Sequence, residues 1–152
     1  MDNAGIEEKL LLDMKTAMKE RDKLRLETIR GLRSQLKNAV IDKGDKLTED
    51  EVIQVLSGAS KKRKESIEQF KKVGREDRAE IETQELTIIQ SYLPQQLTQD
   101  EIIKMVDSII SEVQAESLND LGKVMGSIMP KIKGRADGKI VQNIVRERLS
   151  TL

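Results

Sequence analysis

A basic, glycine-rich segment near the C-terminus contains residue types that are suited to holding an anion. Glycine lets backbone N–H groups approach a ligand closely, and the start of a following helix offers free N–H groups and the positive end of the helix dipole. Four cationic side chains accompany two glycines here and supply local positive charge. The residues that would form a phosphate-holding turn are Lys131, Lys133, Gly134, Arg135, Gly138 and Lys139.

Ordinary turn chemistry is the favoured explanation of the same segment, and the sequence leaves both interpretations open. Gly134 suits the left-handed position after a helix, and Asp137 suits the N-cap of the next one. As an N-cap, the Asp137 carboxylate would occupy the amides that a bound anion needs. The segment also lacks the Gly-Lys-Ser/Thr ending of a P-loop, so it is not a nucleotide-binding loop of that type.

A second group of cationic side chains lies in the N-terminal half of the chain. If the helices that carry them were adjacent, these side chains would form a patch able to grip a nucleic-acid backbone. Both helices also carry acidic residues, and such a run is usually a solvated face, which is the favoured interpretation. The group consists of Arg30, Arg33 and Lys37 on one expected helix and Lys61, Lys62, Arg63 and Lys64 on the next. Single-strand binding needs aromatic platforms, and Phe70 and Tyr92 are both expected in the core.

The sequence offers little support for a self-sufficient active site. The chain has no histidine and no cysteine, which excludes a classical Ser-His-Asp triad, thiolate catalysis and cysteine-ligated metals. The acidic residues around Asp42–Asp50 do not have the spacing of an EF-hand loop. A Ser–Lys arrangement stays open, although nothing local points to one. We therefore expect no metal, no cofactor and no catalysis by this chain alone.

Composition favours an all-α protein. Charged residues make up 36% of the 152 residues and aromatic residues 1%, which is typical of amphipathic helices. The 27 basic and 27 acidic residues cancel, so no global field draws the protein to nucleic acid or to an anionic membrane. The N-terminus lacks the pattern of a signal peptide, and no apolar run is long enough to span a bilayer. We expect a cytoplasmic protein with no membrane partner.

Hydrophobic spacing predicts seven helices in two domains. The first four are expected over residues 5–20, from Asp22 to just before Asp42, from the Thr48–Glu51 capping box to Gly74, and over residues 76–92. Pro94 ends the fourth, because it disfavours helical geometry at the residue before it. The remaining three are expected from the Thr98–Glu101 capping box, from Asn119 or Asp120 to a kink or end at Pro130, and from Asp137. This gives a four-helix, bundle-like domain over residues 1–93 and a three-helix tail over residues 94–152.

The same spacing predicts which apolar side chains are buried. Among those expected in the core are Met18 on the first helix, Ile81 on the fourth, Met129 on the sixth and Ile140 on the seventh. Core packing is the simplest role for Met125 and Met129, although methionine also suits an adaptable partner groove.

Four segments, in this order and at this spacing, resemble the GatB/YqeY family, and specifically its free-standing YqeY-like members. They are residues 27–39 (ETIRGLRSQLKNA), residues 92–97 (YLPQQL), residues 122–126 (GKVMG) and residues 133–138 (KGRADG). The resemblance implies an N-terminal helical bundle followed by a three-helix tail. A similar tail closes the B subunit of the tRNA-dependent amidotransferase, which amidates glutamate or aspartate on mischarged tRNA with glutamine as ammonia donor. In that enzyme the tail is implicated in holding tRNA.

The resemblance implies a non-catalytic tRNA-binding or accessory module. Carbon–nitrogen ligase activity with glutamine as amido-N-donor is the family-level link, and it belongs to a separate catalytic domain that we do not find in these 152 residues. The expected partners are tRNA, amidotransferase subunits or another protein. The alternative is a protein-interaction module that acts without RNA, through the long polar third helix and the methionine-containing tail surface. An independent enzyme ranks last.

Overall fold

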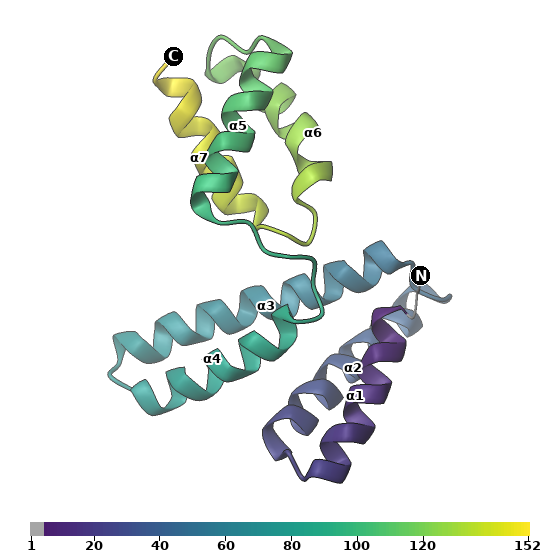
Figure 1. The fold of residues 1–152 in the computed structure, drawn as a ribbon. Helices are drawn as coiled ribbons and strands as arrows, with labels where there is room; N and C mark the ends of the chain where they lie inside the picture. Colours follow the sequence, from purple (N-terminus) through teal and green to yellow (C-terminus); the bar gives the residue numbers. More distant parts are fainter. Residues whose placement is uncertain (1–4) are drawn as a thin grey trace. The chain divides into compact units, whose positions relative to one another are not determined.

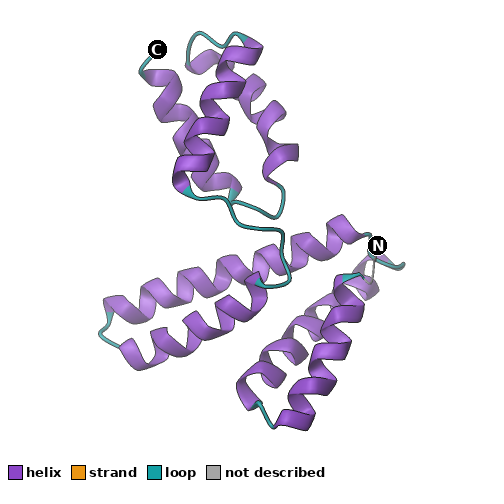
Figure 2. Cartoon of the chain, in the orientation of Figure 1, coloured by secondary structure: helices purple, strands orange, loops and turns teal. Residues whose placement is uncertain are grey.

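The chain is all-α in the computed structural model, which describes residues 5–152 (Figures 1 and 2). Within these residues no strand occurs, and the helices are α1 Ile6–Glu20, α2 Lys23–Lys43, α3 Glu49–Lys72, α4 Glu76–Gln90, α5 Gln99–Val113, α6 Leu121–Ile132 and α7 Gly138–Ser150. A short 3₁₀ helix, Leu118–Asp120, precedes α6. The predicted all-α class and the predicted helices are confirmed. Residues 1–4 lie outside the described residues. They are part of the predicted first domain and of the N-terminus in which we expected no signal peptide.

The helices group into two compact units, Met1–Pro94 and Gln95–Leu152. We call the first the N-terminal unit and the second the tail. The division falls within the expected hinge, and the assignment of residues 1–93 and 94–152 as two domains stays a prediction.

The local signals in the sequence explain where several helices begin. In both capping boxes the threonine hydroxyl accepts from the backbone N–H of the third helical residue. These distances are 3.1 Å for Glu51 N to Thr48 Oγ1 and 3.2 Å for Glu101 N to Thr98 Oγ1. Each glutamate reaches back to the threonine N–H, so two otherwise unpaired donors are satisfied at each helix start. Pro130, where an end or a kink was expected, does not end α6, which continues through it to Ile132.

The N-terminal unit consists of two helical hairpins, α1–α2 and α3–α4 (Figure 1). Its core lies where the hairpins meet and contains the fully buried Leu10, Ile29, Leu56 and Ile89. Tyr92 is also buried, and its hydroxyl donates to the Asp13 carboxylate on α1. Burial and the hydrogen bond to Asp13 both raise the pKa of Tyr92. The chain after α4 is thereby fixed to α1.

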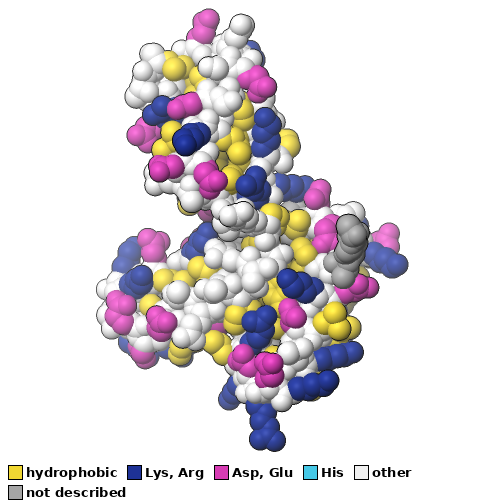
Figure 3. All heavy atoms as spheres, viewed as in Figure 1, with side chains coloured by type: hydrophobic (Ala, Val, Ile, Leu, Met, Phe, Trp, Pro, Cys, Tyr) yellow, Lys and Arg dark blue, Asp and Glu magenta, His cyan; other side chains and the backbone are white. Residues whose placement is uncertain are grey.

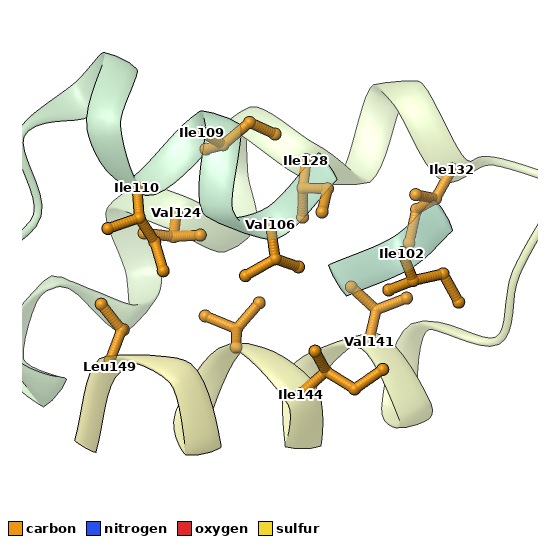
Figure 4. Close-up of a cluster of buried hydrophobic side chains, with 11 residues drawn as sticks. Ile102, Val106, Ile109, Ile110, Val124, Ile128, Ile132, Val141, Ile144 and Leu149 are labelled. Carbon is orange, nitrogen blue, oxygen red and sulfur yellow. The ribbon is translucent and has the colours of Figure 1, made fainter. Parts of the chain in front are cut away.

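The tail has a separate core formed by α5, α6 and α7 (Figure 4). Its fully enclosed side chains include Val106 on α5, Ile128 on α6 and Val145 on α7. At the surface, Arg148 on α7 forms two hydrogen bonds with the Asp107 carboxylate on α5, at 2.8 and 2.6 Å. This pair holds the last helix against the first helix of the tail.

Four apolar side chains that were expected in the core are exposed. The exposed fractions are 49% for Met18, 43% for Ile81, 44% for Met129 and 49% for Ile140. Met129 and Ile140 lie at the edges of their helices' buried stripes, because each is next to a buried residue and about 100° further around the helix. Ile81 lies in the half of α4 near the α3–α4 turn, which points away from α1 and α2 (Figure 1). Their helical spacing was correct, but no further element among residues 5–152 covers them enough to bury them.

Candidate functional site

The glycine-rich segment forms the connection between α6 and α7, and its backbone is largely engaged in internal hydrogen bonds. Gly134 adopts φ +74°, a left-handed conformation that favours glycine. The N–H groups of Arg135 and Ala136 both donate to the Ile132 carbonyl, at 2.8 and 3.1 Å. The segment therefore closes α6 with a tight turn, as the turn interpretation predicts.

Asp137 is the N-cap of α7. Its Oδ1 accepts from the Lys139 N–H at 3.0 Å, so this amide is not available to an external anion. Gly138 begins the helix, and an added Cβ there would lie 3.4 Å from Cε of Met129, an ordinary contact. No close backbone approach requires glycine at this position. Any anion binding by this segment would therefore depend mainly on its side chains.

The segment before α5 braces this turn. Leu97 N donates to the Arg135 carbonyl at 2.9 Å, and Gln96 Nε2 donates to the Gly134 carbonyl at 2.7 Å. In return, Arg135 Nε donates to the Gln95 carbonyl at 3.1 Å. Two of the sequence segments noted above, residues 92–97 and 133–138, thus contact each other directly. The half-buried Arg135 has a structural role as well as a positive charge.

A groove of about 470 Å³ lies beside this turn, between α5 and α6. We call it the tail groove. Its floor is apolar and its rim carries three cationic side chains and one carboxylate. The lining residues are Leu97, Glu101, Lys104, Met105, Ser108, Ile109, Lys131 and Arg135. The pKa of Glu101 is lowered, first by its hydrogen bond from the Thr98 N–H, so this carboxylate is held in place as an anion.

The tail groove brings together some of the predicted residues and adds one that the sequence did not indicate. Lys131 and Arg135 line it, and Lys104 joins them from α5. Lys133 and Lys139 are exposed on the same connection but do not line the groove. Lys104 was missed because it is a single lysine on an amphipathic helix, and only the packing of α5 against α6 places it beside Lys131.

The second predicted group is divided between two places in the N-terminal unit. Arg30, Arg33 and Lys37 line a groove between α1 and α2. Lys62 and Arg63 instead line a recess with Gly31 and Gln35 of α2. Arg33 is two residues from both Gly31 and Gln35, which places it about 200° around the helix from them.

The remaining members of this group do not extend either site. Arg63 Nη1 lies 3.0 Å from Glu82 and 2.9 Å from Glu85 on α4, so its charge is used between helices. Lys61 and Lys64 are exposed on α3 and line neither the groove nor the recess. Lys62 and Arg63 thus line a different site from Arg30, Arg33 and Lys37, and one continuous basic patch stays a prediction.

Charges of both signs are interspersed over the face of the protein seen in Figure 3. Among residues 5–152, no cluster of acidic side chains has the arrangement of a metal site, and no helix is long and apolar enough to cross a membrane. The geometry defines an all-α protein with two separate groove surfaces, each bordered by basic side chains.

Comparison with known proteins identifies the family. The Yqey-like protein family model matches residues 7–149, and the chain belongs to this family. It is 32% identical over 142 residues to altered inheritance of mitochondria protein 41, mitochondrial, of Pyrenophora tritici-repentis, a match that covers 91% of this chain and 78% of that protein. The protein of the same name from Lachancea thermotolerans is 40% identical over 105 residues, covering 67% of this chain and 56% of that protein.

A shorter match connects the chain to a component of an amidotransferase. The E subunit of glutamyl-tRNA(Gln) amidotransferase from Thermococcus gammatolerans is 32% identical over 60 residues, which covers 37% of this chain and 10% of that protein. The predicted membership of the family and its relation to tRNA-dependent amidotransferases are therefore confirmed. The match covers only a small part of the amidotransferase protein.

Proposed function

We propose that this chain is a non-catalytic tRNA-binding module, and that the tail groove and the adjacent α6–α7 connection contact the RNA. The observation that carries the proposal is the convergence of Lys104, Lys131 and Arg135, from α5, α6 and the following turn, around one groove. The relation to a glutamyl-tRNA(Gln) amidotransferase protein supports tRNA as the ligand.

The arrangement suits recognition of RNA shape and backbone. Lysine provides a mobile point charge that pairs with phosphate, and such contacts position a nucleic acid without reading its sequence. Proteins recognise folded RNA largely through phosphates, 2′-hydroxyl groups and overall shape. Lys131 and Lys139 are exposed and on successive helices, so both side chains have access to a ligand that lies across the α6–α7 connection. In this proposal the chain holds tRNA for an amidotransferase or another tRNA-handling assembly, which performs the chemistry.

Measurement of tRNA affinity against salt concentration tests the proposal. Each phosphate contact on a duplex contributes about −0.9 to the slope of log affinity against log salt. The triple variant Lys104→Glu, Lys131→Glu, Lys139→Glu should therefore bind more weakly, with a slope smaller in magnitude by about 2 to 3. Arg135 is left unchanged because its side chain also donates a hydrogen bond to the Gln95 carbonyl, and its loss could disturb the fold of the turn.

A charge-matched control separates this site from a general effect of net charge. Lys19 on α1 and Lys71 and Lys72 on α3 are exposed and lie in the N-terminal unit. Their triple glutamate variant has the same net charge as the tail variant and should retain the wild-type slope. No tRNA binding at low salt, or equal slopes for the two variants, would remove the proposal.

The alternative function, a protein-interaction module without RNA, makes the opposite prediction for partner capture. Complexes formed through α3 or the tail surface should survive both nuclease treatment and high salt, whereas a tRNA-bridged complex should not. A cytoplasmic location is also part of our proposal, although the fungal relatives carry the word mitochondrial in their names. Cell fractionation with the native protein tests it.

A further inference from the structure

The groove between α1 and α2, which we call the α1–α2 groove, differs from the tail groove in size and in lining. Its volume is about 910 Å³ and its floor is mainly apolar. The apolar side chains that line it are Leu10, Leu11, Met14, Met18, Leu36 and Val40. Leu10 and Leu36 are buried, but Met18 is 49% exposed, so the floor extends from the core to the open surface.

The residues that α1 contributes follow one face of the helix. Glu7, Leu11, Met14 and Met18 recur at intervals of four, three and four. From Glu7 to Met18 the helix rises about 16 Å, or three turns. A partner helix presents its anchor side chains at the same intervals, which is the usual arrangement when a helix binds in a groove. The two methionines are flexible and polarisable, and they adapt to the shape of a partner side chain.

Charge is distributed unevenly along the walls of the groove. Arg30, Arg33 and Lys37 line the α2 side at intervals of three and four, and all three are exposed. Arg33 Nη1 lies 3.3 Å from Sδ of Met14, so this guanidinium borders the floor directly. On the α1 side the charged residues are Glu7 and Glu8, near the start of the helix. The α2 wall is therefore a positive rail beside an apolar floor.

We propose that the α1–α2 groove binds an amphipathic helix of a protein partner. The apolar stripe of that helix would cover Met14 and Met18, and acidic side chains along one flank would face Arg30, Arg33 and Lys37. The positive charges call for an anionic flank, and the apolar floor selects a helix over a nucleic acid, because a phosphate backbone gains nothing from a floor of leucine and methionine. The lining contains no aromatic side chain on which a base would stack. The inference goes beyond tRNA binding and stands on the N-terminal unit alone.

Two labelled helical peptides of about 14 residues, or about 21 Å of helix, test the proposal. Both carry leucines at helical intervals on one face, and one has a glutamate flank where the other has a lysine flank. The glutamate peptide should bind the wild-type protein more than about tenfold tighter, because juxtaposed like charges weaken association strongly. The double variant Arg33→Glu, Lys37→Glu should reverse this preference.

Variants of exposed α1 residues provide the matched control. Met18→Asp places a carboxylate on the apolar floor and should lower the affinity for the glutamate peptide more than about tenfold. Leu12→Asp makes the same change at a residue that is 61% exposed and does not line the groove, so it should leave peptide affinity unchanged. Circular dichroism and the tRNA slope should match wild type in both variants, which separates a failure of this proposal from a failure of tRNA binding.

Three results would overturn the assignment of the groove. The first is equal affinity for the two peptides, and the second is an unchanged affinity in Met18→Asp. The third is a different occupant, shown by a protein dimer that Met18→Asp dissociates or by tRNA that competes with the peptide for the groove. Preference for the glutamate peptide, reversal in the double variant and loss in Met18→Asp together support it.

Discussion

The two grooves carry similar charge but have different surroundings, and the difference indicates what each is built to bind. In the tail groove, Lys104, Lys131 and Arg135 come from three separate segments and surround a small space beside a braced turn. In the α1–α2 groove, the cations lie in one row on α2 and border an apolar floor about twice as large. Convergent point charges suit phosphates on an irregular RNA surface, whereas a charged row beside an apolar strip suits a helix. Cationic residues alone do not specify the ligand.

The largest expected effect concerns the independence of the two units that carry these grooves. Ile128 is fully enclosed in the tail core, so Ile128→Ala should destabilise the tail by about 2–5 kcal/mol. Hydrogen exchange should show faster opening of α5–α7 amides while α1–α4 amides remain protected. Leu56→Ala, in the N-terminal core, should have the reciprocal effect. Equal loss of protection in both units would show that they unfold together, and the two grooves could then not be treated as separate.

A second prediction concerns the turn that shapes the tail groove. Gly134→Ala should cost about 1–2 kcal/mol, because a Cβ is disfavoured at φ +74°. Gly126→Ala, within α6 and with nothing near its added Cβ, should instead stabilise the tail by about 0.5–1 kcal/mol. Denaturant unfolding followed by a tail-specific probe measures both. If Gly134→Ala left the free energy of unfolding unchanged, the left-handed turn would not explain why glycine is present. A ligand-binding role for the Gly134 backbone would then be the better explanation.

The capping boxes provide a matched pair across the two units. Thr98→Ala should remove about 1 kcal/mol from the tail, and Thr48→Ala about the same from the N-terminal unit. Only Thr98→Ala should also alter the tail groove, because the Thr98 hydroxyl caps the start of the helix that carries Glu101, which lines the groove. The measurement is unfolding of each unit, combined with tRNA affinity. An equal change in tRNA affinity for both variants would argue against a role for the tail groove.

Comparison of the sequence predictions with the structure shows which features have local signals. Helix positions and starts followed from local rules, namely hydrophobic spacing, Thr-x-x-Glu capping boxes, Asp22 and Asp137 as N-caps, and Gly134 as a left-handed residue. Burial at the edges of the apolar stripes could not be predicted in this way, because the exposure of Met129 and Ile140 depends on whether another helix covers them.

The features that define the sites are long-range and had no local signal. Lys104 lines the same groove as Lys131 only because α5 packs on α6. The Tyr92 hydroxyl donates a hydrogen bond to Asp13, which is 79 residues away in the sequence. Similarly, the Glu49 carboxylate on α3 accepts from the Ile6 N–H and satisfies a donor at the start of α1. The sequence shows which residues are cationic, but only the three-dimensional arrangement shows which of them line the same groove.

The smallest expected effect is a difference in acid sensitivity between the units. Hydrogen bonds from Lys43, the larger cause, and from the Thr48 N–H lower the pKa of Glu51 to about 2, from an ordinary value of 4.5. Because the folded pKa is lower, this stabilisation is fully present above pH 4.5 and is lost as pH falls towards 2. Glu51→Gln should therefore flatten the acid dependence of N-terminal unfolding in that range and leave tail unfolding unchanged. An acid profile identical to wild type would show that the exposed pair with Lys43 contributes nothing measurable.

Lysine footprinting of the wild-type protein tests the central claim most directly, because it needs no substitution. The protein is acetylated with a small reagent in the presence and absence of tRNA at low salt, and modification is read out at each lysine by mass spectrometry. Our account predicts that tRNA protects Lys104, Lys131 and Lys139 in the tail, while Lys37 in the α1–α2 groove and Lys61 and Lys64 on α3 stay as reactive as before. Protection of Lys37, Lys61 and Lys64 with the tail lysines unchanged would contradict it.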